Sequence, residues 1–141
     1  MRRFFRHPTD IPICVKTAVV SKEEQCDMKD LSEGGLSCFL YSLIEVGMIV
    51  DITITSIDPP YYGQGKIVWA KLCNDNSATP CYEVGIKFTD NDEMYKVRMV
   101  QQICHIEQYR RRILEEEGRE LDSNTAAQEW IQLYAADFGR H

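Results

Sequence analysis

Residues 48–57 read Met-Ile-Val-Asp-Ile-Thr-Ile-Thr-Ser-Ile, and this stretch decides the fold class. From position 50 to position 55 an apolar residue alternates with a polar one. Because successive side chains of a strand point to opposite faces, the alternation predicts a β-strand with one buried face and one face in water. Asp58, Pro59 and Pro60 end this strand, since proline cannot donate to a ladder.

Five more segments between residues 10 and 90 have the same character, with β-branched residues between turn signals. Together the six predicted strands cover residues 12–20, 25–29, 36–40, 48–57, 65–72 and 82–88. Six short strands joined by short turns predict an antiparallel barrel, because closure leaves no exposed sheet edge. We therefore expect a mainly β protein built on a six-stranded antiparallel β-barrel.

The segment after residue 90 is predicted to be helical. Residues 91–138 contain no proline and a single glycine, Gly118, and apolar residues recur there at helical spacing. Asp90 and Glu93 fit a capping box at the start of a first helix, and Gly118 is expected to end it. The polar residues at 123–125 are expected to cap a second helix. Arginines at 110–112 followed by glutamates at 115–117 indicate a solvated helix face.

Composition and charge exclude several classes of protein. Hydrophobic residues make up 44% and charged residues 27% of the chain, so an intrinsically disordered protein is excluded. The net charge of −6 disfavours a uniformly basic nucleic-acid binder. The longest apolar stretch, residues 38–50, is too short and too interrupted to span a bilayer. The first eight residues lack the apolar run of a secretory signal, so a cytoplasmic location is expected.

The six cysteines are expected to be reduced thiols that pack as small hydrophobes. No two of them stand at CxxC spacing, and the three histidines do not cluster near them. Because a zinc site takes its ligands in close pairs, neither a metal site nor a cofactor is expected.

Two short motifs stand apart from this background. The first is Arg-Arg-Phe-Phe-Arg at residues 2–6, whose guanidinium groups match a phosphate or a guanine edge through paired hydrogen bonds. The second is Asp-Leu-Ser-Glu-Gly-Gly at residues 30–35, at a turn between strands. There Asp and Ser bond backbone amides, while glycine tolerates positive φ and close approach of a ligand. Taken alone, the motifs also fit a disordered basic tail and an ordinary polar turn.

Taken together, the RxxxR pattern of Arg2 and Arg6 and the DxSxxG pattern of Asp30, Ser32 and Gly35 resemble the PilZ domain. That family binds the bacterial second messenger cyclic di-GMP. The resemblance covers about residues 2–90 and includes residues 82–88, which are similar to the family's common final strand. It implies an N-terminal arginine-rich ligand-binding segment at residues 1–9, a PilZ-type β-barrel at 10–90 and a C-terminal helical appendage at 91–141.

The resemblance also implies a role for the polar residues of each motif. Arg2 and Arg6 would hold the phosphates and the Hoogsteen edge of guanine, and Arg3 would add a stacking or phosphate contact. Asp30 would accept hydrogen bonds from the guanine amino and imino groups. Ser32 would bond a phosphate or the guanine.

The resemblance also implies which residues shape the ligand site and how ligand binding reaches a downstream protein. Gly35 would leave room for the base, with Gly34 beside it in the same turn. Trp69 stands where related domains carry a base-packing side chain, or it is an ordinary barrel residue. The residue before the first motif is Met1, and the resemblance implies that an apolar residue there favours one bound ligand; Arg3 could equally support a stacked pair, so the number of bound ligands stays open. Ordering of the N-terminal segment would relay ligand binding to an unidentified downstream protein.

Three other classes of function compete with a cyclic di-GMP receptor. A protein-interaction adaptor of PilZ fold without nucleotide would lack both motifs, which are present here. The C-terminal helices either pack across an open barrel end or present Trp130, Tyr134 and Phe138 to a partner. A small barrel could bind single-stranded nucleic acid, but the negative net charge counts against a nucleic-acid polymer. An enzyme is least expected, because the sequence has no carboxylate pair, phosphate loop or metal cluster.

Overall fold

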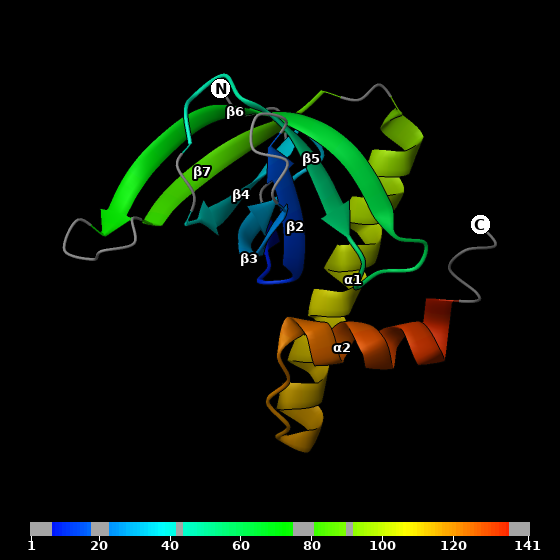
Figure 1. The fold of residues 1–141 in the computed structure, drawn as a ribbon. Coiled ribbons are helices and arrows are strands. Elements are labelled where there is room, and N and C mark those ends of the chain that lie inside the picture. The colour runs from blue at the N-terminus through cyan, green and yellow to red at the C-terminus, as the bar shows by residue number, and fades with distance from the viewer. Residues whose placement is uncertain (1–6, 18–22, 42–43, 75–80, 90–91, 136–141) are drawn as a thin grey trace.

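The computed structural model describes residues 7–17, 23–41, 44–74, 81–89 and 92–135, which form a barrel of strands followed by two helices (Figure 1). The strands are β1 (His7–Pro8), β2 (Pro12–Thr17), β3 (Glu23–Leu31), β4 (Gly35–Leu40), β5 (Ile49–Ile54), β6 (Tyr61–Asn74) and β7 (Cys81–Phe88). The helices are α1 (Glu93–Glu117) and α2 (Ser123–Trp130), and α2 continues into the π-helical turn η1 (Ile131–Ala135).

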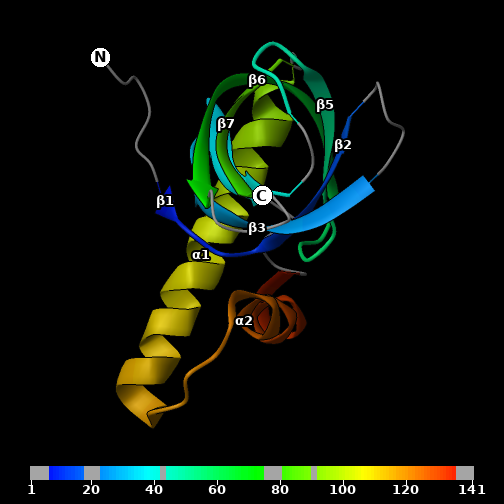
Figure 2. The same cartoon turned by 60° about the vertical axis from the view of Figure 1, so that its left-hand side comes forward.

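Strands β2 to β7 close into a six-stranded antiparallel barrel, which Figure 2 shows from another side. The order of pairing is β3-β2-β5-β6-β7-β4, and β4 pairs with β3 to complete the ring. The short strand β1 is an addition that the sequence did not predict, and it pairs with β3. The expected fold, a six-stranded antiparallel barrel followed by helices, is confirmed.

Strand β6 begins four residues earlier than predicted, at Tyr61 instead of Gly65. The glycines in this segment suggested a break, yet a Cβ on Gly63 would overlap the Tyr61 ring. Gly63 thus makes room for a fully buried aromatic side chain and does not interrupt the strand. Strand β5 is in turn shorter than predicted and ends at Ile54.

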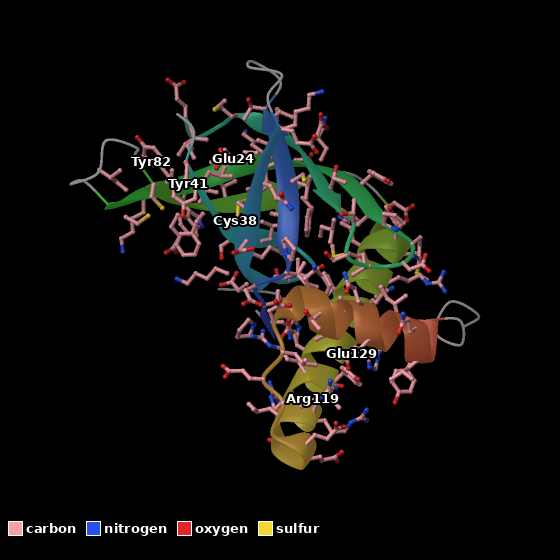
Figure 3. All side chains as sticks on the ribbon, turned by 60° about the horizontal axis from the view of Figure 1, so that its bottom comes forward. Glu24, Cys38, Tyr41, Tyr82, Arg119 and Glu129 are labelled. Carbon is pink, nitrogen blue, oxygen red and sulfur yellow. The ribbon has the colours of Figure 1, made fainter. Side chains whose placement is uncertain are left out.

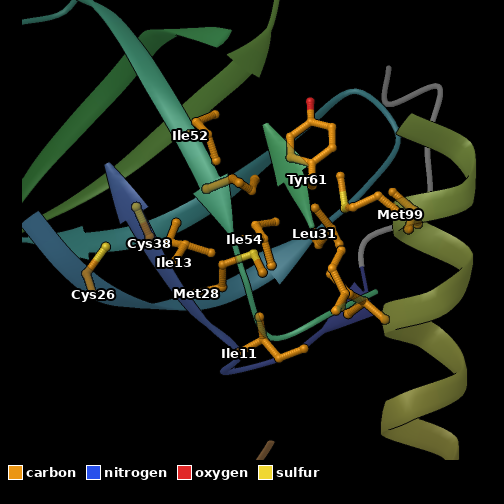
Figure 4. Packing of buried hydrophobic residues seen from close by; sticks show 14 of the residues in the cluster. Ile11, Ile13, Cys26, Met28, Leu31, Cys38, Ile52, Ile54, Tyr61 and Met99 are labelled. Carbon is orange, nitrogen blue, oxygen red and sulfur yellow. The ribbon is translucent and has the colours of Figure 1, made fainter. Parts of the chain in front are cut away.

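The barrel interior and one face of α1 share a single hydrophobic core (Figure 4). Tyr61 stacks on Tyr95 of α1 at 5.1 Å between ring centroids and meets Phe88 edge-on at 5.8 Å. Ile103 and Ile106 of α1 are fully buried. Burying a large apolar side chain stabilises the fold by about 1.5–3 kcal/mol, so these contacts hold α1 against the barrel.

Both helices begin at an aspartate that the sequence analysis did not choose. Asp92 caps α1 by accepting a hydrogen bond from the Tyr95 amide at 3.0 Å, so the assignment of the cap to Asp90 was wrong. Asp122 caps α2 in the same way, and residue 123 already lies inside the helix. The predicted end of α1 is confirmed, because Gly118 has the left-handed φ of 67° that glycine adopts at little cost.

Helix α2 lies across the part of α1 that extends beyond the barrel (Figure 1). Trp130 is buried and stacks on His105 at 6.0 Å between ring centroids, so it does not belong to an exposed docking face. Tyr134 is 40% exposed, and Phe138 lies outside the described residues. No helix in the described ranges is long and apolar enough to cross a membrane.

Candidate functional site

A bulge in β3 places Asp30 on the outer face of the barrel. Met28 pairs with Cys38, but Asp30 pairs with Ser37, so Lys29 is an extra residue on β3. Because side chains alternate across a strand, one extra residue exchanges the two faces for everything that follows. Asp30 therefore points outward, and Leu31 is fully buried in the core.

Asp30 and Ser37 begin a line of residues that crosses four strands on this outer face. Ser37 of β4 pairs with Gly85 of β7, and Gly85 pairs with Trp69 of β6. Directly paired residues of antiparallel strands lie on the same face of the sheet. These four residues, which we call the outer row, lie side by side over about 14 Å, at roughly 4.8 Å per strand.

The carboxylate of Asp30 is held in place by Ser37. The Ser37 hydroxyl donates a hydrogen bond to Asp30 Oδ1 at 2.8 Å, and the Ser37 side chain is only 1% exposed. Hydrogen bonds to a charged group contribute about 1.5–3 kcal/mol, so this contact fixes the direction of the carboxylate. The sequence analysis missed Ser37, although pairing outward from the turn at residues 30–35 would have placed it opposite Asp30.

Trp69 lies half-buried at the other end of the outer row. Its indole covers the backbone of Gly85, and a Cβ on Gly85 would overlap the indole nitrogen. Trp69 is not a member of the buried core cluster, so its ring lies on the outer surface of the barrel. A glycine therefore stands at the centre of β7 because any larger residue there would overlap the Trp69 ring.

The serine and glycines of the DxSxxG motif shape the turn itself. The Ser32 hydroxyl, on a buried side chain, accepts a hydrogen bond from the Gly34 amide at 3.2 Å and donates to the Gly35 carbonyl at 3.3 Å. Gly34 accepts a further bond from the Phe88 amide at 3.0 Å. Gly35 lies in an extended strand, and a Cβ there would overlap the Ile86 carbonyl. These contacts show packing against β7 where the sequence analysis expected positive φ.

Two lysines flank the outer row and were not recognised from the sequence. Lys87 of β7 pairs with Gly35 on one side and with Lys66 of β6 on the other, and both lysines are exposed. Lys87 lies two positions from Gly85 along β7, about 7 Å away on the same face, and Lys66 lies beside Lys87 on the next strand. Because the net charge of the chain is negative, composition alone did not indicate a basic patch. Period-two alternation through residues 82–88 nevertheless places Lys87 on the same face as Gly85.

The residues that directly follow the arginine motif, His7 and Pro8, pair with β3 beside Asp30. Arg2, Arg3 and Arg6 themselves lie outside the described residues. The described chain starts at His7, which pairs with Leu31, and Pro8 pairs with Asp30. The segment that carries the arginines is therefore attached at the Asp30 end of the outer row.

A polar cluster joins the start of the barrel to both helices. Thr9 donates to Glu107 at 2.8 Å, Ser123 donates to Glu107 at 2.7 Å, and Arg110 forms an ion pair with Asp10 at 3.0 Å. Ser123 also bonds Asp10 and accepts from Arg110 at 2.9 Å. We call these five residues the helix junction. Arg110 is half-buried and bonds Asp10, Glu107 and Ser123, so it is not part of the solvated face that the run at 110–112 had suggested.

The cysteines are free thiols, and they form no metal centre in the described part of the chain. A hydrogen bond with Cys26 and burial both raise the pKa of the Cys38 thiol above its ordinary value, which keeps it protonated. Among the described residues there is no group of three or more His, Cys, Asp or Glu side chains that could hold a metal ion.

Comparison with known proteins identifies relatives of this fold. The family model for the PilZ domain matches residues 1–104. The PilZ domain of YcgR from Escherichia coli with c-di-GMP aligns with a TM-score of 0.64 at 15% identity, covering 82% of this chain and 98% of that chain. A longer YcgR chain from E. coli, in complex with c-di-GMP, aligns at 0.60 and 17% identity over 84% of this chain, which spans 50% of it.

A third solved structure is the PilZ domain of CeSA from a cellulose-synthesizing bacterium. It aligns with a TM-score of 0.53 at 24% identity, covering 68% of this chain and 94% of that chain. No curated protein matches the sequence. At these identities the structural matches establish the shared barrel fold.

Proposed function

Because the chain belongs to the PilZ domain family, we propose that it is a receptor for cyclic di-GMP and not an enzyme. The ligand binds on the outer row, and the arginine motif at residues 2–6 closes over it. The register of four strands places Asp30 and Trp69 on one face, and the arginine-bearing segment joins the sheet at the Asp30 end of this row; this arrangement carries the proposal.

The outer row offers chemistry that suits guanine. The Asp30 carboxylate accepts hydrogen bonds from the amino and imino groups of the base, and Ser37 holds it in the required direction. A base without those donors would leave a desolvated carboxylate unpaired, which costs affinity. The indole of Trp69 provides a flat surface on which a base stacks, and such stacking contributes about 1–3 kcal/mol per base.

The phosphates of the ligand are met by cations from two parts of the chain. Arg2, Arg3 and Arg6 supply guanidinium forks, which pair with phosphate through two parallel hydrogen bonds. Lys66 and Lys87 supply exposed ammonium groups beside the outer row. Local positive charge is thereby available on a chain whose net charge is −6.

Ligand binding is relayed to the helices through the helix junction. Residues 2–6, β1 and the pair Thr9 and Asp10 are consecutive in the chain, so ordering the first segment restrains the next. Thr9 and Asp10 bond Glu107, Arg110 and Ser123, which position α1 and α2. In this proposal residues 1–9 bind the ligand, residues 10–90 form the barrel on which it lies, and residues 91–141 contact a downstream protein.

Titration calorimetry of the full chain with cyclic di-GMP, GTP and cyclic di-AMP tests the proposal. We expect the wild type to bind only cyclic di-GMP, and we expect Arg6→Ala and Asp30→Ala to lose at least about tenfold in affinity, since each removes a charged hydrogen bond of about 1.5–3 kcal/mol. Asp27→Ala is the matched control, because Asp27 is an exposed acid on the same strand outside the outer row.

Two outcomes would contradict the proposal. One is a folded wild type that binds none of the three nucleotides, which would favour the adaptor without nucleotide. The other is an Asp30→Ala variant that binds as tightly as Asp27→Ala. For the relay, amide exchange in α2 that is the same with and without saturating cyclic di-GMP would contradict coupling through the helix junction.

A further inference from the structure

Two of the six cysteines face each other at the end of the β6–β7 pair. β6 carries a second bulge there, since Leu72 pairs with Tyr82 and Asn74 pairs with Cys81, which leaves Cys73 as an extra residue. In a bulge, the extra residue and the one after it stand opposite a single residue of the partner strand. A regular ladder would already pair Cys73 with Cys81, and the bulge leaves both Cys73 and Asn74 opposite Cys81, so the two cysteines lie on the same face.

The thiols of this pair are in direct contact and reachable from solvent. Cys73 Sγ lies 2.6 Å from Cys81 Sγ and 3.1 Å from the Cys81 carbonyl oxygen. Cys73 is exposed and Cys81 is half-buried, whereas Cys26 and Cys38 are buried in the barrel. The expectation that the cysteines serve as small hydrophobes in the core therefore does not account for Cys73 and Cys81.

The surroundings of the pair distinguish its two sulfurs. Partial burial raises the pKa of the Cys81 thiol, and the hydrogen bond with Cys73 raises it further. The nearby charge of Cys81 and a hydrogen bond with it raise the pKa of Tyr41, whose amide is held by Glu24 at 2.6 Å (Figure 3). Cys81 is thus kept as a thiol near neutral pH, and the exposed Cys73 is the sulfur that a solute meets first.

We propose that Cys73 and Cys81 form a modification site at which a low-molecular-weight disulfide, such as oxidised glutathione, introduces a reversible cross-link between β6 and β7. The Cys73 thiolate attacks one sulfur of oxidised glutathione, and one glutathione leaves as its thiol. Cys81, held against Cys73, then loses its proton and its sulfur attacks the Cys73 sulfur of the mixed disulfide, so that the second glutathione leaves and takes up that proton. The two protons lost by the cysteines are carried by the two glutathione thiols, so the protein is oxidised and glutathione is reduced.

The cross-link would restrain the strands that carry the candidate ligand site. Cys81 and Gly85 lie on the same face of β7, about four residues or roughly 14 Å apart. The bond closes a loop of about nine residues, and the loss of chain entropy in the unfolded state raises the melting temperature by about 5 °C. Formation of the bond needs no nucleotide, so its failure is distinct from failure of the proposed function.

Thiol counting on the full chain tests the proposal. The wild type is equilibrated with excess oxidised glutathione, denatured, alkylated with iodoacetamide and weighed by mass spectrometry. We expect two fewer alkylated cysteines than the six in the sequence, a cross-linked peptide containing Cys73 and Cys81, and recovery of all six on adding reduced dithiothreitol. Cys81→Ser should instead keep one glutathione bound to Cys73, Cys73→Ser should bind none because the half-buried Cys81 is the less reactive thiol, and neither variant should show a rise in melting temperature.

Cys104→Ser is the matched control, because Cys104 is a half-buried thiol on α1, and this variant should still form the cross-link. Six alkylated cysteines in the oxidised wild type would overturn the proposal. So would a cross-link that persists in Cys73→Ser, because the bond would then involve a different pair.

Discussion

The indole of Trp69 covers the backbone of Gly85, its direct pairing partner across β6 and β7. Both residues lie in the outer row, in line with Asp30 and Ser37. Glycine is needed here because any Cβ would overlap the ring, and the contact keeps the indole flat against the barrel. An aromatic surface is thereby held in a fixed orientation before any ligand arrives, which lowers the entropy lost on binding.

We expect Trp69→Ala to weaken cyclic di-GMP binding at least about fivefold, since stacking contributes about 1–3 kcal/mol per base. Gly85→Ala should weaken it as well, because the added methyl group displaces the indole. Calorimetry measures both, and Tyr62→Ala, which removes an exposed aromatic ring from β6 outside the outer row, should bind as the wild type does. Full affinity in Trp69→Ala would show that the ring does not contact the ligand.

Ser37→Ala tests whether the orientation of Asp30 matters. Removing the hydroxyl leaves the carboxylate without its 2.8 Å donor, so we expect cyclic di-GMP affinity to fall severalfold although Ser37 is buried beneath the surface. Calorimetry and a thermal melt separate lost affinity from lost stability. Ser56→Ala, which removes a hydroxyl that bonds Asn124, serves as the control. Equal affinities of the two variants would argue against this role for Ser37.

The helix junction should be a sensitive point of stability. Ser123 is 1% exposed and bonds Asp10, Glu107 and Arg110, so Ser123→Ala leaves the half-buried Glu107 and Arg110 short of a partner. We expect a loss of about 1–3 kcal/mol in the free energy of unfolding, measured by urea denaturation. Thr125→Ala, at a half-buried position of α2 outside the junction, should cost less. A free energy of unfolding that is unchanged in Ser123→Ala would contradict this, because it would mean that water replaces the hydroxyl without cost.

Acid should weaken the contact between α1 and α2 through Glu129, which lies near Arg119 in Figure 3. Arg119 donates to Glu129 at 2.8 Å and Tyr109 donates at 2.7 Å, and these bonds lower the pKa of the carboxyl. A group whose pKa is lower in the folded state stabilises the fold above its ordinary pKa of 4.5 and loses that effect as the pH falls through the folded value.

Glu129→Gln should therefore unfold more easily than the wild type at neutral pH, and the difference should shrink in acid, once the pH has fallen below 4.5 and through the lowered pKa of the folded wild-type carboxyl. Urea denaturation at the two pH values measures this. Glu115→Gln, on an exposed position of α1, should show no such pH-dependent difference. If the free energies of unfolding of the wild type and Glu129→Gln differed as much in acid as at neutral pH, lost packing and not lost charge would explain the difference.

Local patterns were sufficient for the elements of the fold and for part of the site. Alternation at residues 48–57 predicted β5, and Gly118 predicted the end of α1, because each depends on neighbouring residues only. Caps were predicted less well. Several polar residues could cap each helix, and in the structure Asp92 and Asp122 are the ones that accept a hydrogen bond from a first-turn amide. Ser37, Lys66 and Lys87 were missed because their relation to Asp30 depends on strand register.

By itself, the sequence determined a mainly β chain with a helical end and two motifs similar to those of PilZ domains, because side-chain periodicity and short motifs are properties of adjacent residues. Only the tertiary structure decided that Asp30 and Trp69 share a face. Extra residues at Lys29 and Val68 each shift the register by one position, and which residue bulges is settled by burial across the whole barrel. The junction of Asp10 with Ser123 likewise arises only when the helices fold back onto the barrel.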